Sequence, residues 1–147
     1  MRILTKNLSD WHPRMRRTLR QATLSGGWLK KYMSIFPNAR TITIFNERQM
    51  MGWAFCVPAD NTIYLQMFVN PRYRGRHLGT KLAEEALRHF PSVTLAEWDH
   101  ATKRLFRKLR DAHPGRISTY IYTWAKESRK FRRLKIAQAP ALNGSMK

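Results

Sequence analysis

Short segments of the chain alternate apolar and polar residues with a period of two, the pattern of half-buried β-strands. Between residues 39 and 45, for example, Ile42 and Ile44 each follow a threonine. Segments with this pattern, or with a short apolar run bounded by turn residues, predict strands over residues 1–8, 39–45, 50–57, 62–69, 93–96 and 117–124. The second and third of these form a predicted β-hairpin.

Other segments repeat their apolar residues at the three- and four-residue spacing of an amphipathic helix. Ser9 and Asp10 offer capping oxygens before the first helix, Gly26 and Gly27 separate it from the second, and Pro91 ends the third. This spacing predicts helices over residues 11–22, 28–36, 82–90 and 101–112.

The third predicted helix lies between the strands over residues 62–69 and 93–96. A strand, a helix and a strand within about thirty-five residues form a βαβ unit, whose two strands run parallel. We therefore expect an α/β fold in the broad sense, with the α+β arrangement. Its mixed, mostly antiparallel sheet would contain a central parallel pair of strands and be flanked by about four helices.

The C-terminal segment is strongly basic. Residues 126–135 hold six basic side chains and one acidic side chain, and the apolar residues among them fit either a helix or a strand. We favour a strand that pairs back on residues 117–124. Residues 137–147 predict a disordered tail, so that residues 1–136 form a single domain.

The composition fits one folded domain with a polyanionic partner. A chain of 147 residues buries about 70% of the surface that it exposes when unfolded, and 43% of these residues are hydrophobic. Lysine and arginine total 28 against 9 acidic residues, a formal net charge of +19. Basicity also maintains solubility, but acidic residues do this better, so we expect the charge to attract RNA, DNA or an acidic protein.

The sequence argues against several kinds of site. Cys56 is the one cysteine, which excludes an intrachain disulfide, and the 5 histidines lack the close spacing of a metal site, so no metal is expected. No apolar run approaches the ~20 residues that cross a bilayer, and the N-terminus lacks the apolar core of a signal peptide. We expect no membrane association and a cytoplasmic location. The size and charge also suit a phage protein in the host cytoplasm.

The segment that carries chemistry follows the strand over residues 62–69. A turn at Asn70 and Pro71 leads into Arg-Gly-Arg-His-Leu-Gly, residues 74–79, and then directly into a helix. Amides at a helix N-terminus lack partners and carry partial positive charge, and glycine lets the backbone approach a ligand closely. The loop therefore suits a pyrophosphate, with further positive charge from Arg72, Arg74, Arg76 and Lys81.

This loop resembles the signature of the GNAT superfamily of N-acetyltransferases. The signature is Arg or Gln, two variable residues, Gly, one variable residue, and Gly or Ala. Arg74 occupies its first place and Gly79 its last, while His77 stands where Gly is usual. The likeness follows the order of elements over residues 42–106 and is specific over residues 65–87.

The resemblance implies a GNAT fold in which the parallel strands splay around a site for acetyl-CoA. The backbone of residues 67–69 would pair with the pantetheine arm, and the Met67 amide would stabilise the tetrahedral oxyanion. For His77 we favour a structural or phosphate-facing role over base catalysis. The cofactor-binding residues implied in this way are Met67, Phe68, Val69, Arg74, Gly75, Arg76, His77, Leu78, Gly79, Thr80 and Phe106.

The source of the proton for the leaving thiolate is open. In a second block of the family, a tyrosine can protonate the thiolate, but this chain has Phe106 at that place and therefore no hydroxyl. The proton would come from Tyr120, from Tyr122 or from water, or the chain has lost turnover.

The base that would deprotonate an acceptor amine is also open. Glu97, Asp99 and His100 stand near the end of the second parallel strand, and open α/β sheets bind ligands beyond the carboxyl ends of their strands. Each of the three also fits a solvated residue or a helix cap.

Two functions are compatible with these features. The first is an acetyl-CoA-dependent N-acetyltransferase acting on an amine of a polyanionic or nucleic-acid-associated target, such as aminoacyl-tRNA or a ribosomal or other nucleic-acid-bound protein. The second is a catalytically impaired GNAT-fold module that docks on nucleic acid or an acidic protein, as His77 and Phe106 would favour. We favour the enzyme, because the retained phosphate loop has little purpose without a nucleotide ligand.

Overall fold

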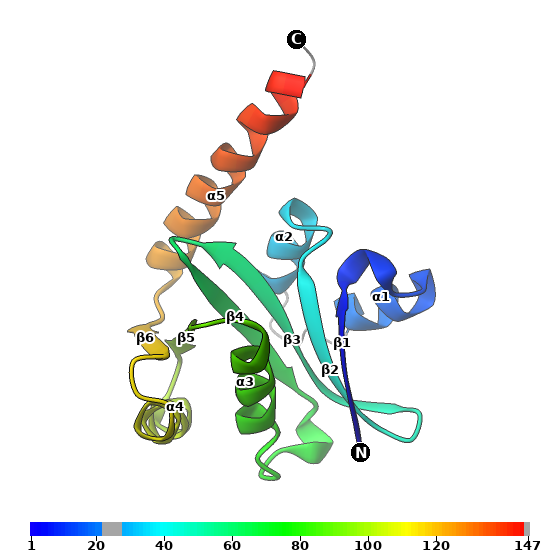
Figure 1. Ribbon diagram of the computed structural model, residues 1–147, viewed down its shortest axis with the longest axis vertical. Coiled ribbons are helices and arrows are strands. Elements are labelled where there is room, and N and C mark those ends of the chain that lie inside the picture. The colour runs from blue at the N-terminus through cyan, green and yellow to red at the C-terminus, as the bar shows by residue number, and fades with distance from the viewer. Residues whose placement is uncertain (22–27, 146–147) are drawn as a thin grey trace.

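The alternating segments pair into one six-stranded sheet in the computed structural model, which describes residues 1–21 and 28–145 (Figure 1). The strands are β1 (Arg2–Asn7), β2 (Arg40–Asn46), β3 (Gln49–Ala59), β4 (Thr62–Val69), β5 (Val93–Glu97) and β6 (Ile117–Ile121). The helices are α1 (Pro13–Gln21), α2 (Trp28–Ile35), α3 (Leu78–His89), α4 (His100–Ala112) and α5 (Trp124–Ser145), with short 3-10 turns at Leu8–Asp10 and Pro71–Tyr73. The end predicted for the first helix at residue 22, the glycine pair at 26–27 and the last two tail residues lie outside the described residues.

The spatial order of the strands is the same as their order in the chain. The pairs from β1 to β4 are antiparallel, and β4 and β5 form the predicted parallel pair. The strand β6 also runs parallel to β5, because α4 carries the chain back across the sheet. The mixed sheet with a central parallel pair is thus confirmed.

The period-two pattern of β3 divides the core into two layers. Ala54 and Cys56 belong to the apolar cluster that contains α3 and α4, whereas Trp53, Phe55 and Val57 belong to the cluster that contains α1, α2 and part of α5. Helices therefore cover both faces of the sheet, with α3 against one of them (Figure 1).

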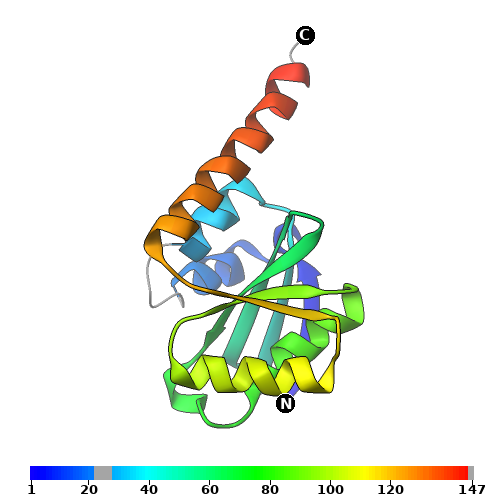
Figure 2. The same cartoon turned by 90° about the vertical axis from the view of Figure 1, so that its left-hand side faces the viewer.

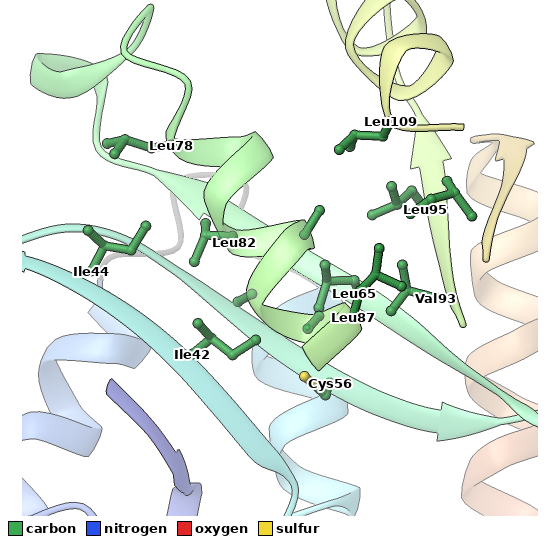
Figure 3. Packing of buried hydrophobic residues seen from close by; sticks show 14 of the residues in the cluster. Ile42, Ile44, Cys56, Leu65, Leu78, Leu82, Leu87, Val93, Leu95 and Leu109 are labelled. Carbon is green, nitrogen blue, oxygen red and sulfur yellow. The ribbon is translucent and has the colours of Figure 1, made fainter. Parts of the chain in front are cut away.

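The helix α3 fixes the position of the loop that precedes it. Its apolar stripe includes Leu78, Leu82 and Leu87, and all three lie in the cluster with Ile42 and Ile44 of β2 (Figure 3). Leu82 is fully buried, so its burial contributes about 2 kcal/mol to the docking of the helix. This packing holds the N-terminus of α3 at the end of the sheet where β4 also ends.

The prediction of a strand over residues 126–135 was wrong. This segment is part of the helix α5, and the helical backbone continues to Ser145 over most of the residues predicted as a disordered tail. The inner face of α5 combines Leu134 with two charged residues, Glu127 and Lys130, which are only 2% and 7% exposed. Because buried charges interrupt the apolar stripe, the helical period was hidden in the sequence.

The helices α4 and α5 lie toward opposite ends of the molecule, and the C-terminal part of α5 extends beyond the sheet (Figure 2). None of the described helices combines the length and the apolar composition that crossing a bilayer requires.

Candidate active site

The parallel strands β4 and β5 are paired over only a short stretch. Their register joins Ile63 to Val93 and Tyr64 to Thr94, and beyond these residues the two strands separate. β4 continues to Val69 with β3 on its other side, so residues 65–69 have one edge that pairs with no described strand. The backbone groups on this edge can therefore pair with an extended ligand.

A cavity of about 290 Å³ fills the space between the separating strands. Most of its walls are apolar or aromatic, and none of its lining residues is acidic. The lining residues are Trp28, Leu29, Leu65, Gln66, Met67, Phe68, Val69, Arg74, Ala96, Trp98, Thr102 and Phe106.

A second hollow of about 380 Å³ continues the cavity toward the N-terminus of α3. The two hollows share Val69, Arg74 and Thr102, so they form one groove that runs from the free edge of β4 to the loop at residues 74–79. The other residues that line the second hollow are Gly75, His77, Leu78, Gly79, Thr80, Ala101 and Leu105.

The loop beside this groove contains a series of backbone donors without protein partners. Within residues 1–21 and 28–145, the amides of residues 75–80 donate to no protein acceptor. Three of these amides belong to the first turn of α3, where the helix dipole adds partial positive charge. This arrangement is the one that binds phosphate groups at helix N-termini.

His77 has a left-handed backbone, with φ 59° and ψ 26°. It is the N-cap of α3, but its side chain makes no capping hydrogen bond. A non-glycine residue pays about 1–2 kcal/mol for this conformation, so the position is one that favours glycine. His77 thus takes the backbone conformation of a glycine, and it is one of the residues that line the groove.

Gly79 lies close to α4. A Cβ at this position would lie 3.3 Å from Cδ2 of Leu105, which is tighter than most Cβ contacts, so the Leu105 side chain would have to shift by a few tenths of an ångström. The missing side chain therefore lets the first turn of α3 approach α4.

Two arginines of the loop have different positions. Arg74 lines both parts of the groove, and its Nε donates to the Val69 carbonyl at 3.3 Å. The Arg76 guanidinium lies over the ring of the buried Tyr73, 5.4 Å from its centre, and Arg76 is not among the residues that line the groove. Only Arg74 is therefore placed to meet a ligand in the groove directly.

Asp99 is occupied as a helix cap. Its carboxylate accepts from the Thr102 amide at 2.8 Å, and the Thr102 hydroxyl accepts from the Asp99 amide, which completes a capping box at the start of α4. Hydrogen bonds from Thr102 hold the pKa of Asp99 below its usual value. The residue therefore has the role of a cap, one of the two readings that the sequence left open.

The other two candidates for a base do not line the groove. His100 is exposed on the first residue of α4. Along β5, Leu95 packs in the core with α3 and α4, whereas Ala96 lines the cavity. Since alternate residues of a strand face opposite sides, Glu97 shares the face of Leu95 rather than that of Ala96.

The two candidate tyrosines lie in different surroundings. The Tyr120 hydroxyl donates to the buried Glu127, and Lys130 donates to Tyr120 at 3.0 Å. Burial and the Glu127 carboxylate raise the pKa of Tyr120 above its usual value, so its proton stays in this network. Tyr120 lines neither part of the groove.

Tyr122 is not among the residues that line the groove, but it contacts two that are. Its hydroxyl accepts from Nε1 of Trp28 at 2.9 Å, and its ring stacks on Trp98 with 3.8 Å between ring centres. Both tryptophans line the cavity. No described residue accepts the proton of the Tyr122 hydroxyl, which therefore stays available.

The sequence did not single out Trp98, Gln66 or Leu29 as site residues. Trp98 had a usable signal, because it lies two residues after Ala96 and beyond the carboxyl end of a parallel strand. Phe106 is 3% exposed and lines the cavity without offering a proton. Among the described residues, no three His, Cys, Asp or Glu side chains lie together in a way that would hold a metal ion.

The comparisons with known proteins agree with this geometry. The family model described as acetyltransferase (GNAT) family matches residues 6–110. A putative acetyltransferase from the GNAT family from Bacteroides thetaiotaomicron has a similar fold, with a TM-score of 0.52 and 16% identity over 76% of this chain and 70% of that chain. A search of curated proteins gave no match. The family match covers more than half of the chain and includes both the separating strands and the loop, so the chain belongs to the GNAT family of acetyltransferases.

Proposed function

We propose that the chain is an acetyl-CoA-dependent N-acetyltransferase whose acceptor is an amine on a polyanionic or nucleic-acid-associated target. One observation carries the proposal: the free edge of β4 leads, through the turn at Pro71–Tyr73, into a loop whose amides from residue 75 onward have no acceptor among the described residues. Strand edge and anion-binding loop together suit a ligand with an amide-bearing arm and a pyrophosphate. Family membership supports acyl transfer in general.

The residues present fit coenzyme A. The free edge at residues 65–69 is about 15 Å long, which accommodates an extended arm. The amides of residues 75–80 and the Arg74 guanidinium would hold the pyrophosphate. When bound as its acetyl thioester, coenzyme A supplies an activated acetyl group.

A further hollow of about 800 Å³ extends the groove between α3 and α4. It shares Gly75, His77 and Thr80 with the second hollow, and its wall holds Arg104 and Lys108 of α4 together with one acidic residue, Glu84. The two basic side chains would hold the nucleotide end of the cofactor.

The opposite end of the cavity would receive the acceptor. Trp28 and Trp98 line it from α2 and from the β5–α4 connection, and Tyr122 touches both rings. We assign proton donation to the Tyr122 hydroxyl, because it is the candidate whose proton is not committed to a described acceptor. With no acidic residue in the lining, the base that the amine needs would be water or a group of the acceptor itself.

The polyanionic target is supported by the distribution of charge. The net charge of +19 is far larger than coenzyme A requires. Basic residues gather on three helices, at Arg14, Arg16, Arg17 and Arg20 of α1, Lys103, Arg104, Arg107, Lys108 and Arg110 of α4, and Lys126, Arg129, Lys130, Arg132, Arg133 and Lys135 of α5.

A second function is a GNAT-fold binding module without turnover. Phe106 favours it, because this residue lines the cavity but has no hydroxyl. The commitment of Asp99 to the cap of α4 favours it as well.

Release of free thiol from acetyl-CoA distinguishes the two functions. The assay would compare aminoacyl-tRNA, a basic ribosomal protein and a short amine without a polyanion, each at equal amine concentration. We expect thiol release with a nucleic-acid-associated amine and much less with the short amine. Tight binding of acetyl-CoA without thiol release on any amine would favour the binding module.

A further inference from the structure

A basic pocket of about 380 Å³ lies beside α5, away from the candidate active site. It shares no lining residue with the groove that runs from β4 to the loop at residues 74–79. Four of its seven lining residues are cationic and none is acidic. The lining residues are Tyr64, Thr94, Tyr120, Lys126, Arg129, Lys130 and Arg133.

The four cations lie on one face of α5. Lys126, Arg129, Lys130 and Arg133 follow the spacing i, i+3, i+4 and i+7, which puts their side chains next to one another over about 10 Å of helix. The pocket therefore concentrates positive charge in a concave site rather than spreading it over the helix.

Two carboxylates pair with residues of the pocket, but neither lines it. Glu127 is 2% exposed and accepts hydrogen bonds from the Tyr32 hydroxyl at 2.7 Å, from the Tyr120 hydroxyl, and from Lys130 Nζ at 3.2 Å. Glu127 therefore forms an ion pair with Lys130, and its hydrogen bonds to the two tyrosines hold this face of α5 against the rest of the protein.

The second carboxylate belongs to the tight turn between β3 and β4. Asp60 and Asn61 have positive φ angles of 53° and 60°, as in a type I′ hairpin. The Asp60 carboxylate accepts two hydrogen bonds from the Arg133 guanidinium and one from the Tyr64 hydroxyl at 2.8 Å. This bidentate pair orients Arg133 at the edge of the pocket.

Two cations of the pocket have no such partner. Lys126 and Arg129 are exposed, and no carboxylate of the described residues lies within salt-bridge distance of either. Among the described residues, Lys126 Nζ donates one hydrogen bond, to the Ile121 carbonyl at 3.4 Å. Their charges are thus available to an anionic ligand.

We propose that this pocket binds a phosphate group of single-stranded nucleic acid. The first residue of the same helix, Trp124, is 63% exposed, although its ring also packs on Trp28 with 4.8 Å between ring centres. Bases of a single strand stack on exposed aromatic rings, whereas an acidic peptide would use the cations alone. The inference rests on the polyanionic partner proposed above, but it does not depend on acetyl transfer.

The test compares two charge-matched double variants of the full chain. Lys126→Gln with Arg129→Gln removes the two unpaired cations of the pocket. Arg132→Gln with Lys135→Gln removes two exposed cations of the same helix that do not line the pocket. Binding of a labelled oligouridine of about 15 nucleotides is measured by fluorescence anisotropy at about 50 mM and about 200 mM salt.

We expect the pocket variant to bind oligouridine about tenfold more weakly than the wild type. The slope of log affinity against log salt concentration should become less steep by about one. The control variant should lose less than about threefold. Equal losses of oligouridine affinity in the two variants would overturn the proposal that this pocket binds phosphate. The absence of oligouridine binding by the wild type at low salt would overturn it as well. Competition by polyglutamate as effective as that of unlabelled oligouridine would overturn the choice of nucleic acid.

Acetyl-CoA binding by the same variants separates this inference from the proposed function. Because the pocket shares no residue with the groove, both variants should bind acetyl-CoA like the wild type. If the wild type binds oligouridine but not acetyl-CoA, the proposed function fails and the pocket stands. If the pocket variant does not fold, Arg129→Gln alone should weaken oligouridine binding about threefold, and an unchanged affinity would overturn the pocket.

Discussion

The hydroxyl of Tyr122 accepts a hydrogen bond from the indole of Trp28, which lies 94 residues earlier in the chain. This contact joins the segment after β6 to α2, and stacking of Tyr122 on Trp98 joins it to the β5–α4 connection. Tyr122 therefore holds together two walls of the cavity that would receive the acceptor.

Tyr122→Phe tests whether this hydroxyl also donates a proton. We expect kcat to fall about a hundredfold while the affinity for acetyl-CoA changes less than about twofold. The lost bond should also lower the free energy of unfolding by about 1 kcal/mol. Steady-state thiol release and chemical denaturation measure the two effects separately.

Tyr120→Phe is the matched control, because it removes a hydroxyl whose proton is already donated to Glu127. It takes a donor from the buried Glu127 and should cost about 2 kcal/mol of stability. Its kcat should stay within about threefold of the wild type at a temperature where both proteins are folded. Equal losses of kcat in the two variants would contradict the assignment to Tyr122.

Phe106→Tyr tests the wall of the cavity that α4 supplies. The substitution adds a hydroxyl at a residue that lines the cavity and occupies the place of the family tyrosine. We expect faster thiol release, by about tenfold, without a change in acetyl-CoA affinity. An unchanged or lower rate in a folded variant would show that the proton does not come from this wall.

His77→Gly tests the left-handed backbone at the start of α3. Glycine adopts a φ of 59° without the steric cost that histidine pays, and its greater freedom in the unfolded chain offsets part of this gain. The variant should be about 0.5–1 kcal/mol more stable than the wild type in chemical denaturation. His77→Ala removes the same ring but keeps the Cβ, so it should show no gain; equal stabilisation by both would refute the explanation.

The tyrosines around Glu127 predict a loss of stability in alkali. Burial and neighbouring carboxylates raise the pKa of Tyr64 to about 12, and they raise the pKa values of Tyr32 and Tyr120 as well. The unfolded chain releases these protons near pH 10 and the folded chain only at higher pH. The contribution of these protonated tyrosines to the free energy of unfolding is therefore complete below about pH 10, and it is lost as pH rises through the pKa values of the folded state.

Denaturant midpoints at about pH 8 and about pH 11 measure this loss. Because lysines also titrate in this range, the informative comparison is with Tyr120→Phe. Its midpoint should fall less between the two pH values than that of the wild type, and an identical fall would contradict the role of Tyr120.

Much of the fold could be predicted from local patterns. The strand over residues 62–69 was predicted with the bounds that β4 has, because its apolar residues alternate and turns flank it. α5 could not be predicted, since Glu127 and Lys130 are buried only because tyrosines from β6 and α2 satisfy them. That satisfaction depends on tertiary contacts, which local spacing does not contain.

The candidate site was predictable where it depends on the backbone. The loop at residues 74–79 and the edge of β4 follow from the order of strand, loop and helix. The functional side chains could not be predicted in this way. Tyr120 and Tyr122 are both tyrosines on one predicted strand, and the sequence does not distinguish their surroundings. Their difference arises where β6 ends at Ile121 and the chain turns, which brings Tyr122 to Trp28 and leaves Tyr120 beside Glu127.

Calorimetry with acetyl-CoA tests the central claim most directly. The groove predicts one binding site at about 50 mM salt, with affinity about tenfold weaker in Arg74→Ala, whose side chain lines the groove. Arg72→Ala, which removes a nearby cation that does not line it, should lose less than about threefold. Absence of binding by the wild type at low salt, or equal losses in the two variants, would contradict the account.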